Sequence, residues 1–209
     1  MSLRLALVIA AATAILVCGG LQSSEAQTPE QKPDAPATAT KPDSGPAAPA
    51  AAESTSDPFG EDTNLAAKPI VFVKGSGTWD SAFETVTGSF KKLRGFIGKK
   101  GLKEDGPLMT IFTATDDTGF NFEAAIPVSE TPKAAAGGDI GVGTSPQGHA
   151  LKFVHRGSYD SLDNTYEAIT NYLDEKRLEA KDMFIEQYVT DPLSTGEENL
   201  VVNVYVLIK

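Results

Sequence analysis

The chain has 209 residues, a formal net charge of −10 and one cysteine. The negative charge and the lack of a basic patch argue against binding to nucleic acid or to anionic lipid. A single cysteine cannot form an intrachain disulfide. The histidines, aspartates and glutamates do not cluster with the spacing of metal ligands, so we expect no metal site and no cofactor.

The first 26 residues have the pattern of a secretory signal peptide. Arg4 is followed by an uncharged apolar run from Leu5 to Cys18. This run is about 14 residues long, whereas about 20 apolar residues are needed to span a bilayer. Ser24 and Ala26 supply the small residues that a signal peptidase requires before its cut. We therefore expect cleavage after Ala26, export to the bacterial periplasm and no membrane span in the mature protein.

Two alternatives concern this same segment. Cys18 is a candidate for lipid attachment, but Val17 stands where a lipobox has a small residue. Retention of the segment, as an anchor or as a buried N-terminal helix, is disfavoured by its length and by the lack of packing partners beside it. We therefore retain cleavage as the prediction.

Residues 27–67 are rich in Ala, Pro, Thr, Ser and acidic side chains and contain almost no bulky apolar residues. Such a segment cannot bury enough surface to offset the entropy of ordering its backbone, about 1–2 kcal/mol per residue. We therefore predict a disordered linker. Residues 68–209 remain as one domain with enough chain to form a core.

The domain contains a sequence repeat. Gly77–Ser81 and Gly157–Ser161 share one aromatic pattern at an offset of 80 residues. Each is followed by apolar positions with the spacing of one helix face, which are Ala82, Val86, Ser89 and Leu93 in the first copy and Leu162, Tyr166, Ile169 and Leu173 in the second. Each copy therefore predicts an amphipathic helix. The basic residues from Lys91 to Lys100 are expected only to face solvent.

Strand candidates surround both helices. One precedes each helix and two follow it, at 70–74, 108–115 and 120–128 in the first copy and 149–156, 183–190 and 200–208 in the second. We predict an α+β fold of two βαββ units, repeat one at about 68–130 and repeat two at about 145–209. Glycine-rich residues 137–143 are interpreted as a flexible connector. Antiparallel sheets related by a pseudo-twofold axis, with one helix per repeat, leave a ligand cleft between the repeats.

Two motifs in the second repeat resemble a known family. They are His155-Arg156-Gly157-Ser158-Tyr159 and Glu186-Gln187-Tyr188-Val189-Thr190-Asp191-Pro192. Together they are similar to the GyrI-like small-molecule-binding domain, which is also the effector-binding domain of some bacterial transcription activators. The resemblance covers about residues 68–209. It implies an aromatic pocket between the repeats in which the carboxylate of Glu186 meets a lipophilic cationic or polar-aromatic ligand.

Strand alternation supports the same residues independently. It places Phe184, Glu186 and Tyr188 on one face of their strand. A cation or a tyrosine hydroxyl compensates a buried carboxylate, and aromatic faces add about 0.5–2 kcal/mol of cation–π attraction. With Tyr159 and Trp79, these three are the predicted ligand-binding residues. Two alternatives stay open: a solvent-exposed face on which Glu186 only aids solubility, and Trp79 as a core anchor.

We expect a non-catalytic periplasmic protein that binds a small molecule, with no catalytic residue assigned. The resemblance also implies a hydrolase alternative, with Glu186 as general base. A structural envelope protein is a third reading. A fourth is haem binding, because the SOUL family has a similar duplicated fold. His149 and His155 lie about 20 Å apart along a strand, so only one of them could be an axial ligand.

Overall fold

The computed structural model describes residues 59–130 and 138–209. The predicted signal peptide and the linker up to residue 58 lie outside the described residues. Within the described part of the chain, no helix combines the length and the apolar character that a membrane crossing requires.

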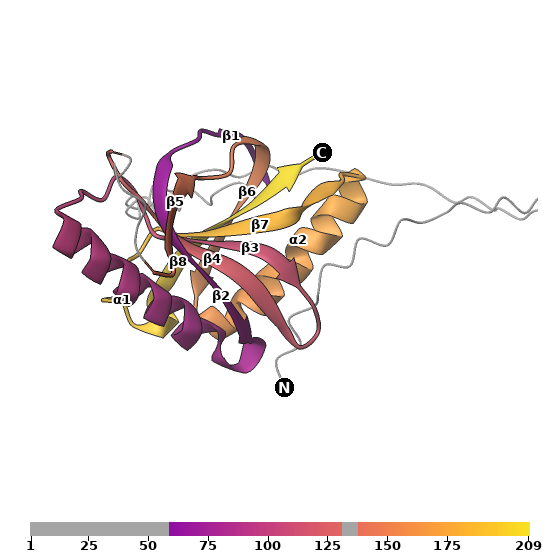
Figure 1. The fold of residues 1–209 in the computed structure, drawn as a ribbon. Coiled ribbons are helices and arrows are strands. Elements are labelled where there is room, and N and C mark those ends of the chain that lie inside the picture. The colour runs from indigo at the N-terminus through magenta and orange to yellow at the C-terminus, as the bar shows by residue number, and fades with distance from the viewer. Residues whose placement is uncertain (1–58, 131–137) are drawn as a thin grey trace, which may run out of the picture. The chain divides into compact units, whose positions relative to one another are not determined.

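The described residues form one eight-stranded antiparallel sheet with two α-helices, which confirms the predicted α+β class (Figure 1). The strands lie in the order β1-β6-β8-β7-β3-β4-β2-β5. Their bounds are β1 Glu61–Leu65, β2 Pro69–Thr78, β3 Met109–Thr115, β4 Gly119–Pro127, β5 Ile140–Thr144, β6 Gly148–Gly157, β7 Ala180–Tyr188 and β8 Leu200–Ile208. The helices are α1 (Ala82–Lys100) and α2 (Leu162–Lys176), and a short 3-10 turn precedes each, η1 (Trp79–Ser81) and η2 (Tyr159–Ser161). A third, η3 (Glu197–Asn199), precedes β8.

The strand order is compatible with two βαββ units. β2-α1-β3-β4 occupies one half of the sheet and β6-α2-β7-β8 the other, and the two halves meet where β3 pairs with β7. Both helices begin at the predicted offset, at Ala82 and Leu162. Reversing the direction along the sheet exchanges the two units, as a pseudo-twofold axis between β3 and β7 requires.

The chain connection from β1 to β2 requires a strongly curled sheet. These strands are six positions apart in the sheet, so a flat sheet would separate them by about 29 Å. Only residues 66–68 join them, and so short a link spans at most about 15 Å. A hollow between the two sheet edges is lined by residues 63–66 and by Ser145 and Pro146, beyond β5, and also by Met109, Ile185 and Tyr205 of the face that carries no helix. The helix-free face is therefore on the inside of the curl.

The core has one part on each face of the sheet. Both helices bury apolar side chains against the outer face, and Tyr188, Phe112 and Phe122 meet them there. The helix-free face holds a smaller cluster of Ile70, Met109, Ile111, Ala125, Ala150, Ile185, Tyr205 and Leu207.

The helix faces match the predicted ones, with a single shift in α1. Phe90 is the buried residue of the third turn in place of Ser89, whose hydroxyl donates to the Thr85 carbonyl. A phenylalanine at i+8 buries far more apolar surface than a serine at i+7, so the face rotates toward it.

The predicted end of the linker at residue 67 is wrong. Glu61–Leu65 form edge strand β1, which pairs along β6. Just before it, the Phe59 ring packs against Phe153 at 4.9 Å and Tyr172 at 5.8 Å between centroids. Composition missed this strand because its order comes from the free edge of β6, which supplies backbone partners that the segment itself does not reveal.

The predicted flexible connector is also corrected, because Ile140–Thr144 form edge strand β5 along β2. The glycines that suggested flexibility serve packing instead. The Phe72 ring lies against Gly141, where a Cβ would come within 2.5 Å of that ring. Close approach of a ring to a backbone requires glycine, and flexibility is only one of its uses.

Candidate ligand-binding site

A buried carboxylate lies at the centre of the domain. Glu186, on β7, is 0% exposed. Its Oε1 accepts a hydrogen bond from the Tyr166 hydroxyl at 2.8 Å, and its Oε2 accepts from Tyr188 at 2.8 Å and from Tyr159 at 3.3 Å. Charge-assisted hydrogen bonds of this kind compensate the cost of removing a carboxylate from water. The alternative in which Glu186 faces solvent is therefore wrong.

Three elements of the second repeat position these groups. Alternation along β7 turns Phe184, Glu186 and Tyr188 toward the helices, while Ile185 joins the cluster on the helix-free face. Tyr159 comes from η2 and Tyr166 from the start of α2. Sequence reasoning named Tyr159 and Tyr188 but assigned Tyr166 only to the core face of its helix. The signal that could have identified Tyr166 was a hydroxyl on the helix face that packs over the strand of Glu186.

Tyr188 is held as a proton donor. Its pKa is raised well above its ordinary value, first by complete burial and then by the negative charge of Glu186. A hydrogen bond from the Thr110 side chain acts in the opposite direction and lowers this pKa, but burial and the Glu186 charge outweigh it. Tyr188 therefore stays neutral and donates its proton to Glu186 through the ordinary pH range.

An aromatic stack extends from this cluster into the first repeat. Phe184 stacks on Phe112 with ring centroids 4.7 Å apart, and Trp79 stacks on the same Phe112 at 6.2 Å. Trp79 also lies 4.8 Å from Phe120, and its indole N–H donates to the Asp116 carbonyl at 2.8 Å. Trp79 therefore anchors the stack, and it also lines a cavity.

A cavity of about 350 Å³ lies where the two helices begin. Both repeats contribute to it, because Trp79 and Phe83 come from the first and Tyr159 from the second. Its lining includes four acidic residues, namely Asp80, Glu84, Asp160 and Glu197. The Phe83 and Tyr159 rings lie 5.1 Å apart. Glu186 does not line the cavity. Tyr159 stands between the cavity and Glu186, since it lines the cavity and its hydroxyl donates to Glu186 Oε2.

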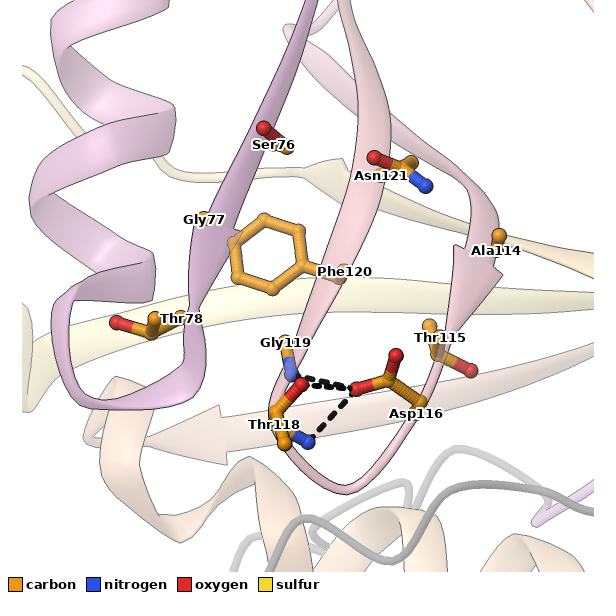
Figure 2. A pocket seen from close by; sticks show the side chains of 10 residues that line it. All are labelled: Ser76, Gly77, Thr78, Ala114, Thr115, Asp116, Thr118, Gly119, Phe120 and Asn121. Atoms are coloured by element: carbon orange, nitrogen blue, oxygen red, sulfur yellow. Dashed lines mark hydrogen bonds between the residues drawn. The ribbon is translucent and has the colours of Figure 1, made fainter.

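A second hollow, of about 270 Å³, lies at the β3–β4 hairpin (Figure 2). There Asp116 Oδ1 accepts hydrogen bonds from the Thr118 amide at 2.7 Å, the Thr118 hydroxyl at 2.6 Å and the Gly119 amide at 3.0 Å. These bonds, the hydroxyl first, lower the pKa of Asp116. The carboxylate thus closes the turn and is not a free ligand group.

The two histidines considered for haem have local partners. His149 Nε2 lies 2.8 Å from Asp62 Oδ2. His155 is buried, with Nδ1 2.8 Å from Thr165 Oγ1 and Nε2 3.0 Å from the Ser158 carbonyl. Across residues 59–130 and 138–209, no three His, Cys, Asp or Glu side chains come together as a metal site.

Arg94 links the two repeats, so the expectation that the basic run of α1 only faces solvent is wrong for it. Arg94 Nε donates to Glu104 Oε1 at 3.1 Å, and Nη1 donates to Asp191 Oδ2 at 2.6 Å. Partial burial acts to lower the Arg94 pKa, but the hydrogen bonds to both carboxylates outweigh it and the pKa is raised. Asp191 of the Glu-x-Tyr-x-x-Asp-Pro motif therefore has a structural partner.

Solved structures share this fold. The C-terminal domain of EcmrR has a TM-score of 0.57 at 16% identity, over 71% of this chain and 96% of that one. SAV2435 bound to tetraphenylphosphonium has a TM-score of 0.53 at 16% identity, over 72% of this chain and 93% of that one. A hydrolase from Listeria innocua has a TM-score of 0.53 at 10% identity, over 72% of this chain and 92% of that one. EcmrR in a DNA complex has 0.62 at 14% identity, and the chain spans only 56% of that protein.

No protein with a curated description matches the chain. Residues 63–209 match the GyrI-like small molecule binding domain. This match begins within β1 and includes all the residues around Glu186. The chain belongs to the GyrI-like family of small-molecule-binding domains.

Proposed function

We propose that the protein binds a lipophilic cation in the cleft between its repeats, with Glu186 as the counter-ion, after export to the periplasm. The observation that carries the proposal is a fully buried carboxylate held by three tyrosine hydroxyls. A lone buried charge is costly, and a cationic guest compensates it more fully than neutral hydroxyls do. The aromatic side chains of Trp79 and Phe83, which line the cavity beside this cluster, are available to the apolar part of such a guest.

The cavity beside the cluster supports the same ligand class. Its lining includes the acidic residues Asp80, Glu84, Asp160 and Glu197 together with the aromatic residues Phe83 and Tyr159. Negative charge in the lining raises the local concentration of cations, and the aromatic side chains favour an apolar body. The ligand type in SAV2435, whose structure holds tetraphenylphosphonium on the same fold, also supports a lipophilic cation.

Access to Glu186 requires a local rearrangement. The Tyr159 side chain separates the cavity from the carboxylate, and its hydrogen bond to Oε2, at 3.3 Å, is longer than the two 2.8 Å bonds from Tyr166 and Tyr188. The bond from Tyr159 is therefore the weakest of the three. We infer that a ligand enters by moving Phe83 and Tyr159 apart and replaces the Tyr159 hydroxyl at Oε2.

Isothermal titration of tetraphenylphosphonium into the wild type, Glu186→Gln and Glu123→Gln tests the proposal. Glu123 is a matched control because it is a sheet glutamate that pairs in register with Ile111, a residue of the helix-free face. We expect Glu186→Gln to weaken binding by at least about 10-fold, equivalent to about 1.4 kcal/mol, through loss of the buried charge. Glu123→Gln should bind as the wild type does.

Equal binding by both variants would rule out the role given to Glu186. Absence of binding and of thermal stabilisation in the wild type would instead favour a structural envelope protein.

The hydrolase alternative is supported by the shared fold of the Listeria innocua hydrolase alone. It requires turnover of a small ester that disappears in Glu186→Gln. The expectation that the chain does not bind nucleic acid stays a prediction, because EcmrR of similar fold forms a DNA complex.

A further inference from the structure

The buried hydroxyl of Thr110 lies in the same space as Glu186. Thr110 pairs with Glu186 across β3 and β7, and directly opposed residues of neighbouring strands present their side chains on one face with Cβ atoms about 4.5–5.5 Å apart. Thr110 is 0% exposed, and its Oγ1 accepts no hydrogen bond in the described structure. Buried hydroxyls are nearly always paired, so this oxygen requires an explanation.

None of the tyrosine hydroxyls near Thr110 donates a hydrogen bond to its Oγ1. Burial raises the Tyr188 pKa and a hydrogen bond from the Thr110 side chain acts to lower it, so the Thr110 proton is directed at the Tyr188 oxygen, while the Tyr188 proton is donated to Glu186 Oε2 at 2.8 Å. Tyr166 and Tyr159 also donate to Glu186. All three tyrosine protons are thus directed at the carboxylate, and the acceptor lone pairs of Thr110 Oγ1 stay unused.

We propose that Thr110 and Glu186 together bind a protonated amine, a cation with at least one N–H, in preference to a quaternary cation. This inference rests on the proposed function and specifies its ligand class. An ammonium N–H donates to Glu186 and a second N–H donates to Thr110 Oγ1, which satisfies the oxygen that the free protein leaves unpaired. A quaternary cation meets the charge of Glu186 but has no proton for Thr110.

The preference for an amine follows because a bound quaternary cation leaves Thr110 Oγ1 without a hydrogen-bond donor, whereas a bound amine does not. A site that contains a hydrogen-bonding group discriminates strongly against an analogue that lacks the matching group, because the group of the protein is then left buried and unpaired. Thr110 also lies at the junction of β3 and β7, where the two repeats meet, so a ligand held there contacts both halves of the domain.

The test uses a matched pair of probes on the full chain, 4-phenylbenzylamine and its N,N,N-trimethyl derivative, both cationic at pH 7. Isothermal titration compares the wild type, Thr110→Val, Thr110→Ser and Glu186→Gln. Valine keeps the shape of threonine without the hydroxyl, and serine keeps the hydroxyl. We expect Thr110→Val to weaken the amine about 10-fold and to change the quaternary probe less than about 2-fold. Thr110→Ser should keep the preference for the amine.

Stability separates this effect from damage to the fold. Because Thr110→Val keeps the shape of the side chain and removes a buried hydroxyl whose acceptor lone pairs are unused, its thermal midpoint should stay close to that of the wild type while its amine affinity falls. Equal loss of both probes, or no loss of either, in Thr110→Val overturns the role of Thr110 alone. Unchanged binding of both probes in Glu186→Gln overturns the proposed counter-ion, and binding of neither probe to the wild type overturns both proposals.

Discussion

Glu186 and its three tyrosines form a unit in which each hydroxyl has a different task. Tyr166 and Tyr188 each hold one carboxylate oxygen at 2.8 Å, whereas Tyr159 makes a longer bond at 3.3 Å and faces the cavity. The two short bonds position the carboxylate, and under the proposed function the long bond is the one that a ligand displaces. Tyr159 and Tyr188 are both almost completely buried, so their hydroxyls have no access to water as an alternative partner.

Tyr188 predicts a pH dependence of stability. Its pKa in the folded protein lies above the unfolded value of about 10, so the folded state holds this proton more tightly. The stabilising contribution is complete below about pH 10 and is lost as the pH rises above that value. Tyr188→Phe should reduce the free energy of unfolding by about 1–3 kcal/mol at pH 7, because Glu186 loses a donor, and should lose less stability than the wild type between pH 9 and pH 11. Urea unfolding at several pH values measures both effects, and equal alkaline losses in the two proteins would contradict the assignment.

At the scale of elements, α1 is tied to the loop after β7 by a charged pair that crosses from one repeat to the other. Arg94 of α1 contacts Asp191, and it also contacts Glu104 in its own repeat. The Asp191 side chain accepts the Leu193 amide at 2.9 Å as well, which orders the loop that receives the arginine. The pair therefore fixes the C-terminal half of α1 relative to the second repeat.

A double-mutant cycle with Arg94→Met and Asp191→Asn measures this tie. Both side chains are about one-third exposed, so solvent screening limits the expected coupling to about 0.5–1 kcal/mol. The coupling should shrink in 1 M NaCl. Lys92 and Asp139 provide the control, since their side chains are 48% and 78% exposed and no measurable coupling is expected. A coupling of zero at Arg94 and Asp191 would show that the contact does not stabilise the fold, and a coupling unaffected by salt would show that it is not electrostatic.

At the scale of the whole domain, the β5 edge of the sheet is held by close packing against β2. Phe72 projects from β2 over Gly141 and Gly143 of the neighbouring strand. Side chains at those two glycines would collide with the ring and push β5 away from β2. The small cluster on the helix-free face would then lose part of its cover.

Gly141→Ala should therefore destabilise the protein by about 1–3 kcal/mol through overpacking, because its Cβ would lie 2.5 Å from Phe72. Gly88→Ala is the matched control. Gly88 lies in α1 with nothing within 4 Å of an added Cβ, so alanine should stabilise the helix by about 0.5–1 kcal/mol. Chemical denaturation measures both changes, and the expected result is that they have opposite signs. A neutral or stabilising Gly141→Ala would show that the β5 edge can relax.

Periodic patterns in the sequence predicted the elements that repeat. The offset of 80 residues located both helix starts, and alternation placed Phe184, Glu186 and Tyr188 on one face. Edge strands β1 and β5 were missed because a strand at a sheet edge is ordered by the neighbour that it pairs with. Tyr166 and Thr110 were missed for a similar reason. Their roles depend on which strand or helix lies opposite, and no local pattern contains that information.

The sequence by itself determined the α+β class, the helix positions and the identity of the central carboxylate, because amphipathic periodicity and short motifs are local properties. Only the tertiary structure decided that Glu186 is fully buried, that three tyrosines from separate elements donate to it and that Thr110 faces it with an unpaired oxygen. The physical reason is that burial and hydrogen bonding are relations between segments distant in the chain. They are established when β3 pairs with β7 and α2 packs on the sheet.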